Sequence, residues 1–157
     1  MVIKEQFVSP ILMWIIVIIG IVLILNFMPN TRLINIGFYG LIIFIITLIY
    51  WLYFIGSALF IHRKAVSSVG GINNIVKTGI YKIVRHPIYS SDIVLAFGIF
   101  FIFQTFDVLL CIIWLSVVLF FWMKLEEKSL IRKFGKEYEE YKRKVPMFIP
   151  NFIPANP

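Results

Sequence analysis

Two short clusters contain most of the side chains in this sequence that could do chemistry. The first cluster is the run Thr78-Gly79-Ile80-Tyr81-Lys82-Ile83-Val84-Arg85-His86-Pro87-Ile88-Tyr89. Pro87 suits the first turn of a helix, because its missing N–H would have no partner there. The N–H groups after Pro87 could then bind an anion such as a carboxylate, with Arg85 and His86 as further donors. The alternative is an interfacial belt, in which the tyrosines lie at head-group depth and Arg85 and His86 contact lipid phosphates.

The second cluster is the acidic pair Glu126-Glu127, which closely follows a long apolar run. A carboxylate pair beside an anionic membrane surface is unfavourable unless it accepts hydrogen bonds, for example from sugar hydroxyls or an amine. The alternative is a solvated helix start, where acidic side chains are stabilised by the helix dipole. The sequence has no nucleotide-binding glycine motif, zinc-protease motif or serine-hydrolase motif. The single cysteine, Cys111, lies in an apolar run, so we expect neither an internal disulfide nor a metal site.

The elements that must position these clusters are apolar helices. Hydrophobic residues make up 61% of the 157, the mean hydropathy is +0.93, and the apolar residues come in long unbroken runs. Four runs approach or exceed the length needed to cross a bilayer, at residues 10–28, 33–61, 87–103 and 108–123. The last two runs are separated by a short turn, which predicts an antiparallel hairpin. We therefore predict a single-domain, all-α integral membrane protein, residues 1–157, with four transmembrane helices and a cytosolic C-terminal helical segment over 124–144.

The distribution of basic residues predicts the orientation of the chain in the membrane. Of 15 Lys and Arg residues, Arg32 alone falls between the first and second runs. The others fall in the termini and in the loop before the third run, so both termini are expected to be cytosolic. We assign the net charge of +7 to contacts with anionic membrane lipids, because the sequence has no basic–aromatic motif for nucleic acid.

The two clusters together also match a known pattern. The matching residues are Thr78-Gly79-x-Tyr81-x-x-x-Arg85-His86-Pro87-x-Tyr89, a hydrophobic hairpin, Glu126-Glu127-x-x-Leu130-x-x-x-Phe134-Gly135-x-x-Tyr138-x-x-Tyr141, and Val145-Pro146. In this order they resemble the isoprenylcysteine carboxyl methyltransferase family, which is itself similar to membrane phospholipid methyltransferases. The resemblance extends over about residues 66–153.

The resemblance implies S-adenosylmethionine as cofactor and a lipid-soluble methyl acceptor, of which a prenylcysteine-type carboxylate is the family example. The cofactor-binding positions that it implies are Asn73, Asn74, Ile75, Val76, Tyr81, His86, Pro87, Ile88, Tyr89 and Glu126. Arg85 and Lys124 are the candidate catalytic residues, which would hold a negative group of the acceptor. Some relatives carry a substrate-binding arginine where this sequence has Trp122, so we expect weak methylation of a minimal prenylcysteine and better activity on another lipid-soluble acceptor.

Three functions remain open at this point. The first is O-methylation of a lipophilic carboxylate, and the second is N-methylation of a phospholipid or another amine. The third is a non-catalytic four-helix membrane protein. A water-soluble methyl donor and a lipid-like acceptor can meet only at the membrane interface, which is where both clusters are predicted to lie.

Overall fold

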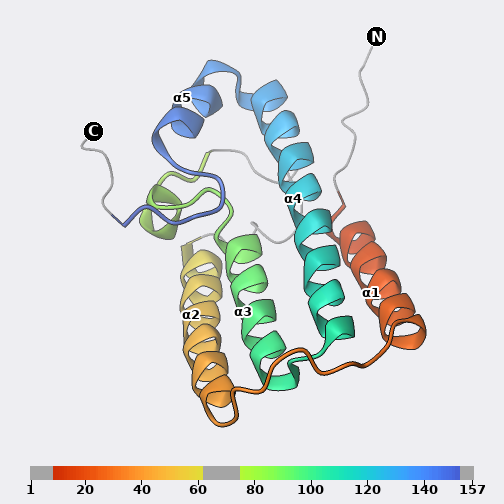
Figure 1. Ribbon diagram of the computed structural model, residues 1–157. Coiled ribbons are helices and arrows are strands. Elements are labelled where there is room, and N and C mark those ends of the chain that lie inside the picture. The colour runs from red at the N-terminus through yellow and green to blue at the C-terminus, as the bar shows by residue number, and fades with distance from the viewer. Residues whose placement is uncertain (1–8, 62–74, 153–157) are drawn as a thin grey trace.

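The computed structural model describes residues 9–61 and 75–152, and its regular elements in these ranges are helices (Figure 1). In chain order they are α1 (Pro10–Phe27), α2 (Tyr39–Ile61), the short 3-10 helix η2 (Gly79–Lys82), α3 (Pro87–Phe103), α4 (Phe106–Phe134) and α5 (Lys136–Lys144).

The four long helices stand side by side in the order α2, α3, α4, α1 (Figure 1). The largest buried cluster lies where α4 packs against α1 and α3, and it includes Met13, Ile93 and Leu119. α2 packs along α3, and glycines allow this approach: a Cβ added at Gly40 would lie 2.1 Å from the carbonyl oxygen of Phe101. Small residues at such contacts bring helix backbones together in membrane proteins.

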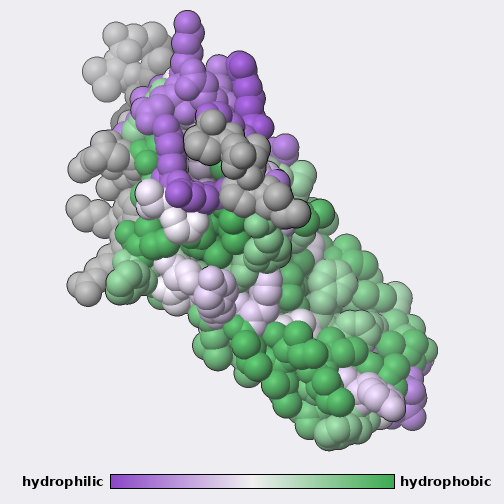
Figure 2. Space-filling view, turned by 90° about the vertical axis from the view of Figure 1, so that its left-hand side faces the viewer, coloured by the Kyte–Doolittle hydropathy of each residue, from purple (hydrophilic) through white to green (hydrophobic). Residues whose placement is uncertain are grey.

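The apolar helices identify a membrane protein. α1, α2 and α4 are long and apolar enough to cross a bilayer, whereas α3 is a shorter apolar helix of 17 residues. Large apolar side chains point outward along α1 and α2, as an apolar solvent requires. Figure 2 shows apolar surface over most of one face and hydrophilic residues gathered at one end. The passage of α3 through the bilayer, and hence the count of four spans, stays a prediction.

The second predicted span begins later than the sequence indicated. It was expected over 33–61, but α2 starts at Tyr39. The chain before it pairs with the turn between α3 and α4, where Leu33 N–H donates to the Gln104 carbonyl at 2.8 Å. Ile36 N–H also donates to Gln104, at Oε1, 3.0 Å away. Gly37 has a φ of +55°, which an α-helix does not accommodate.

The fourth span also ends later than the sequence indicated. The sequence predicted an apolar span over 108–123 and a separate helix over 124–144, but α4 continues unbroken to Phe134. The break falls at Gly135, whose φ is +54°, and α5 follows it. A helix of 29 residues measures about 44 Å against an apolar core of about 30 Å, so the charged end of α4 projects beyond the apolar layer.

Candidate active site

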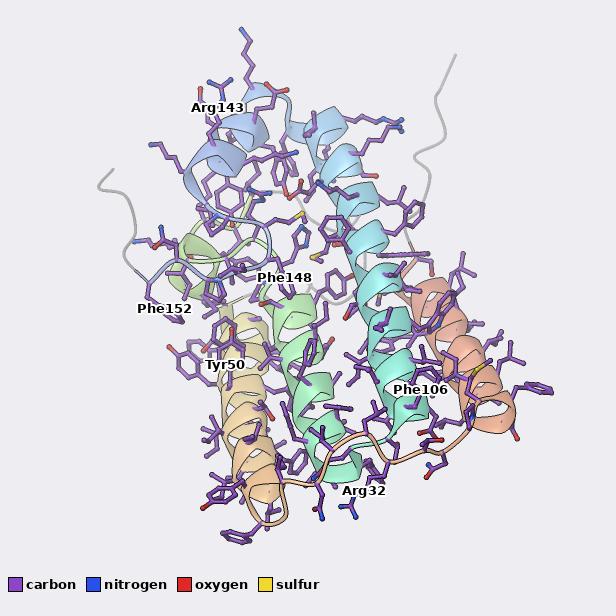
Figure 3. All side chains as sticks on the ribbon, viewed as in Figure 1. Arg32, Tyr50, Phe106, Arg143, Phe148 and Phe152 are labelled. Carbon is purple, nitrogen blue, oxygen red and sulfur yellow. The ribbon has the colours of Figure 1, made fainter. Side chains whose placement is uncertain are left out.

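The two predicted clusters come together at the charged end of the molecule. α3 begins at this end, and α4 returns to it (Figure 1). Glu126 and Glu127, on this part of α4, contact Tyr89 and Arg85. In Figure 3, Arg143 and Phe148 lie at this end, whereas Arg32 lies at the opposite one. The site is thus built from the first turn of α3, the projecting end of α4, and the chain on either side.

One half of the site joins Glu126 to the start of α3. The Tyr89 hydroxyl donates to Glu126 Oε1 at 2.5 Å. His86 Nδ1 lies 3.6 Å from Glu126 Oε2, and the His86 ring stacks on Tyr89 with 5.9 Å between centroids. His86 is buried, and its Nε2 has no hydrogen-bond partner. These three side chains form a polar surface where the apolar helices meet the charged end of the molecule.

The other half of the site is a buried ion pair between Arg85 and Glu127. Glu127 Oε1 accepts from Arg85 Nε at 2.7 Å and lies 2.6 Å from a terminal guanidinium nitrogen. The side chains are only 6% and 3% exposed, and Lys142 Nζ lies 3.1 Å from Glu127 Oε2. His86 Nε2 lies 3.5 Å from Glu127 Oε1. Because the two acids are neighbours on α4, the cluster around Glu127 fixes the position of Glu126 as well.

Residues 145–152, which we call the strap, run beside the first turn of α3. The Arg85 and His86 N–H groups donate to the carbonyls of Pro146 and Met147, at 2.9 and 3.3 Å. Ser90 Oγ donates to the Phe148 carbonyl at 2.8 Å. The strap therefore holds the site through backbone atoms, which the sequence pattern did not predict. Pro146 and Pro150 lie in this segment, and proline is unfavourable inside a helix.

The Arg85 guanidinium is also tied to the end of α5. One terminal nitrogen donates to the Lys142 carbonyl at 2.7 Å and to the Val145 carbonyl. Close by, the Tyr141 hydroxyl donates to the Tyr81 carbonyl at 2.6 Å. Burial, with a smaller contribution from a nearby carboxylate, raises the pKa of Tyr81 to about 12. Both phenols are thus protonated at physiological pH, because burial also raises the pKa of Tyr141 although Arg85 opposes the rise.

The remaining predicted residues have different outcomes. Asn73 and Asn74 lie outside the described residues. Ile75 packs against the cluster of Tyr138, Tyr141 and Val145, and Val76 is half-buried beside it in sequence. Pro87 is the buried first residue of α3, and Ile88 packs against the cluster that contains Phe54. Lys124 lies on the exposed side of α4, with its ammonium 5.2 Å from the centre of the Phe120 ring.

Trp122 occupies the wall of the site on its apolar side. It precedes Glu126 by four residues on α4, so the two side chains share one face of the helix. The indole is buried, its Nε1 has no hydrogen-bond partner, and Tyr89 and Phe148 pack against the same cluster. One turn deeper than the carboxylate, the site therefore offers aromatic surface and a single neutral donor.

The donor and acceptor groups of this site suit a zwitterionic ligand. Among the described residues, no side chain caps the start of α3, so its first N–H groups remain available to an anion such as a carboxylate. His86 Nε2 makes no hydrogen bond within the described residues, although Glu127 Oε1 lies 3.5 Å from it. Glu126 can accept from an ammonium or from sugar hydroxyls. S-adenosylmethionine carries all of these groups, and the residues present fit it.

Comparisons with known proteins agree with the relationship predicted from the motifs. The family model described as phospholipid methyltransferase matches residues 31–137. Methanethiol S-methyltransferase 1 from Bradyrhizobium diazoefficiens is 41% identical over 71 residues, which are 45% of this chain and 24% of that protein. This chain therefore matches about a quarter of the length of that relative.

Proposed function

Because the chain belongs to the phospholipid methyltransferase family, we propose that it is an S-adenosylmethionine-dependent methyltransferase embedded in the membrane by α1 to α4. The observation that carries the proposal is the meeting of His86, Tyr89 and Glu126 where the apolar helices give way to the charged end. With the charged end facing the cytosol, this site is accessible to a water-soluble methyl donor and lies next to the bilayer.

Each residue of the site has a role in this proposal. The first N–H groups of α3, which begin at Ile88 because Pro87 has none, and the His86 side chain hold the carboxylate of the cofactor. Glu126 accepts hydrogen bonds from its amine or its ribose hydroxyls. Tyr81 and Tyr89 line the site, and the segment of Asn73, Asn74, Ile75 and Val76 is assigned to the cofactor by resemblance. Bound S-adenosylmethionine supplies an activated methyl group.

The chain itself contributes mainly proximity and orientation. Methyl transfer is an in-line displacement, so the rate depends on holding the acceptor atom in line with the methyl group. The strap and the aromatic wall around Trp122 exclude water from the site, which favours a reaction in which a positive charge on sulfur is lost. Arg85 acts as a positioning residue, because its donors are directed to Glu127 and to carbonyls at the end of α5.

The acceptor that fits best is a neutral lipid-soluble nucleophile, with a small thiol as the first candidate. A carboxylate in an apolar site needs a cation beside it. Of the two cations predicted for that role, Arg85 is paired with Glu127, and Lys124 lies over Phe120 on the outside of α4. A thiol enters the site uncharged, and as its sulfur takes the methyl group from the sulfonium its S–H proton passes to a base, for which the Glu126 carboxylate is the candidate. The relative from Bradyrhizobium is named for a thiol acceptor. A phospholipid amine is the second candidate, because the family is named for phospholipids.

The test combines cofactor binding with an acceptor panel. S-adenosylhomocysteine should raise the thermal midpoint of the purified protein in detergent, by mass action. With a labelled methyl donor, we expect label in the thioether formed from ethanethiol, rather than in phosphatidylethanolamine or acetyl-farnesylcysteine. Preferential labelling of the prenylcysteine would contradict the proposed acceptor. If no label appears and the midpoint does not shift, the non-catalytic alternative is favoured.

A further inference from the structure

Two large apolar side chains of the strap are exposed outside the helical layer. Ile149 is 74% exposed and Phe152 is 66% exposed, although neither belongs to an apolar helix. Leaving such side chains in water forgoes the free energy that burial of apolar surface supplies. The two residues are three positions apart on a segment that is otherwise tied to the site.

The position of the strap makes these side chains a continuation of the apolar surface of α2. Asn151 N–H donates to the Ile83 carbonyl at 2.8 Å, which holds the end of the strap beside η2. η2 packs on α2, and Phe60, the residue before the last one of α2, is 91% exposed. Figure 3 shows Phe152 beside η2, near the end of α2 that lies at the charged end of the molecule. In Figure 2, which shows this side, the apolar surface extends up to the hydrophilic end.

Basic residues flank this apolar surface. Lys82 is exposed in η2, next to the residue that binds the strap. Lys142, Arg143 and Lys144 form the last turn of α5, directly before the strap. Exposed apolar side chains with basic neighbours are typical of segments that lie in the interface of an anionic bilayer.

We propose that Ile149 and Phe152 insert into the anionic leaflet of the bilayer on the charged side, so that the strap is a membrane anchor. The surface is continuous with the lipid-facing side of α2, and the basic residues beside it are complementary to acidic head groups. The partner is thus the lipid surface itself.

The anchor has a consequence for the site, which rests on the proposed function. The carbonyls of Pro146 and Met147 bind the Arg85 and His86 N–H groups, only a few residues before the anchoring side chains. Insertion into lipid at 149 and 152 therefore stabilises the segment that borders the proposed cofactor site. In an anionic bilayer, cofactor affinity should therefore be higher for the wild-type protein than for a variant without the two anchoring side chains.

The first experiment measures depth and does not depend on function. Cys111 is replaced by serine, and a nitroxide label is placed on cysteine at Ile149, at Phe152 or, as a control, at the exposed Glu140 of α5. In vesicles of phosphatidylcholine and phosphatidylglycerol, labels at 149 and 152 should collide more with oxygen than with a water-soluble nickel chelate. The label at 140 should show the reverse. If 149 and 152 behave like 140, the anchor does not exist.

The second experiment measures the coupling to the site. The double variant Ile149→Ser, Phe152→Ser should bind S-adenosylhomocysteine severalfold more weakly than wild type in anionic nanodiscs. Phe38→Ser, an exposed apolar residue at the opposite end of the layer, should leave the affinity unchanged. Equal affinities of the double variant and wild type would overturn the coupling. If wild type itself binds no S-adenosylhomocysteine, the proposed function fails while the depth result still decides the anchor.

Discussion

Replacing Glu127 with glutamine should destabilise the fold far more than replacing an acidic residue at a solvated helix start would. The change keeps the shape and one acceptor oxygen, but it removes the charge that faces the Arg85 guanidinium at 2.6 Å. Both side chains are almost wholly buried, so water cannot replace the lost charge. Lys142 would also lose its contact with Glu127 Oε2.

The magnitude follows from the burial of the pair. Removing one member of a buried ion pair costs about 3–5 kcal/mol, because the other charge remains buried without compensation. Since glutamine still accepts a hydrogen bond, we expect the lower end, about 3 kcal/mol. For a chain of this size, about 1 kcal/mol lowers the thermal midpoint by about 2–4 °C, so the shift should be about 6–12 °C. Arg85→Met should cost at least as much, because it also leaves two carbonyls at the end of α5 without their donor.

The assays are thermal unfolding in dodecyl maltoside, which gives the thermal midpoint, and equilibrium unfolding in mixed micelles of dodecyl maltoside and SDS, which gives the free energy of unfolding. Both are followed by helical circular dichroism. Glu137→Gln is the matched control, because its partner Lys77 is at a similar distance, 2.7 Å, but the side chains are 58% and 40% exposed. That change should cost no more than about 1 kcal/mol. The double variant Arg85→Met, Glu127→Gln should be more stable than the sum of the two single changes predicts. If Glu127→Gln and Glu137→Gln shift the midpoint equally, the buried pair does not stabilise this site.

Three further predictions concern the cofactor, the orientation and the helix packing. Glu126→Gln should weaken S-adenosylhomocysteine binding by about 1.5–3 kcal/mol in calorimetry, whereas Glu140→Gln on the exposed side of α5 should not; equal affinities of wild type and Glu126→Gln would refute the assignment. A cysteine at Thr31 should react with an impermeant reagent only from outside the cell, and a reporter fused after residue 157 should read cytosolic; the opposite result would separate the site from its cofactor. Gly40→Ala should cost about 1–3 kcal/mol of stability, because its Cβ would lie 2.1 Å from the Phe101 carbonyl oxygen. Gly56→Ala, whose Cβ would have nothing within 4 Å, should be neutral or stabilising. Similar stabilities of the two variants would refute the close contact at Gly40.

Hydropathy alone predicted where the helices lie, because each apolar run must form hydrogen bonds within itself in lipid. It did not predict where they begin and end. Residues 33–38 are apolar enough to continue a span, yet the N–H groups of Leu33 and Ile36 pair with Gln104, which is 68 positions away from Ile36. The continuation of α4 past Met123 was missed for a different reason. A change from apolar to charged residues marks the edge of the membrane, and it does not stop a helix that has no glycine or proline before Gly135.

The motifs predicted that His86, Tyr89 and Glu126 would meet, because each cluster lies at the end of an apolar run that faces the same side. They could not predict the partner of Arg85. Its acceptors lie 42 to 60 residues further along the chain, and two of them are backbone carbonyls that carry no sequence signal. Polar contacts over such separations depend on how α5 and the strap fold back, and no local pattern encodes that.

The pairing of Arg85 also bears on the choice of acceptor. Glu126 and Glu127 are adjacent, and successive side chains on a helix point about 100° apart, so only one of them could face Arg85. Had Arg85 paired with Glu126, the carboxylate would have been withdrawn from the cofactor. With Glu127 in that place, Glu126 contacts Tyr89 and His86, and the guanidinium charge is neutralised by Glu127. A carboxylate acceptor would then have to displace Glu127 from a buried pair, whereas a neutral thiol would leave the pair intact. The same ion pair that stabilises the site is thus the reason why we propose an acceptor that enters uncharged, beside Trp122.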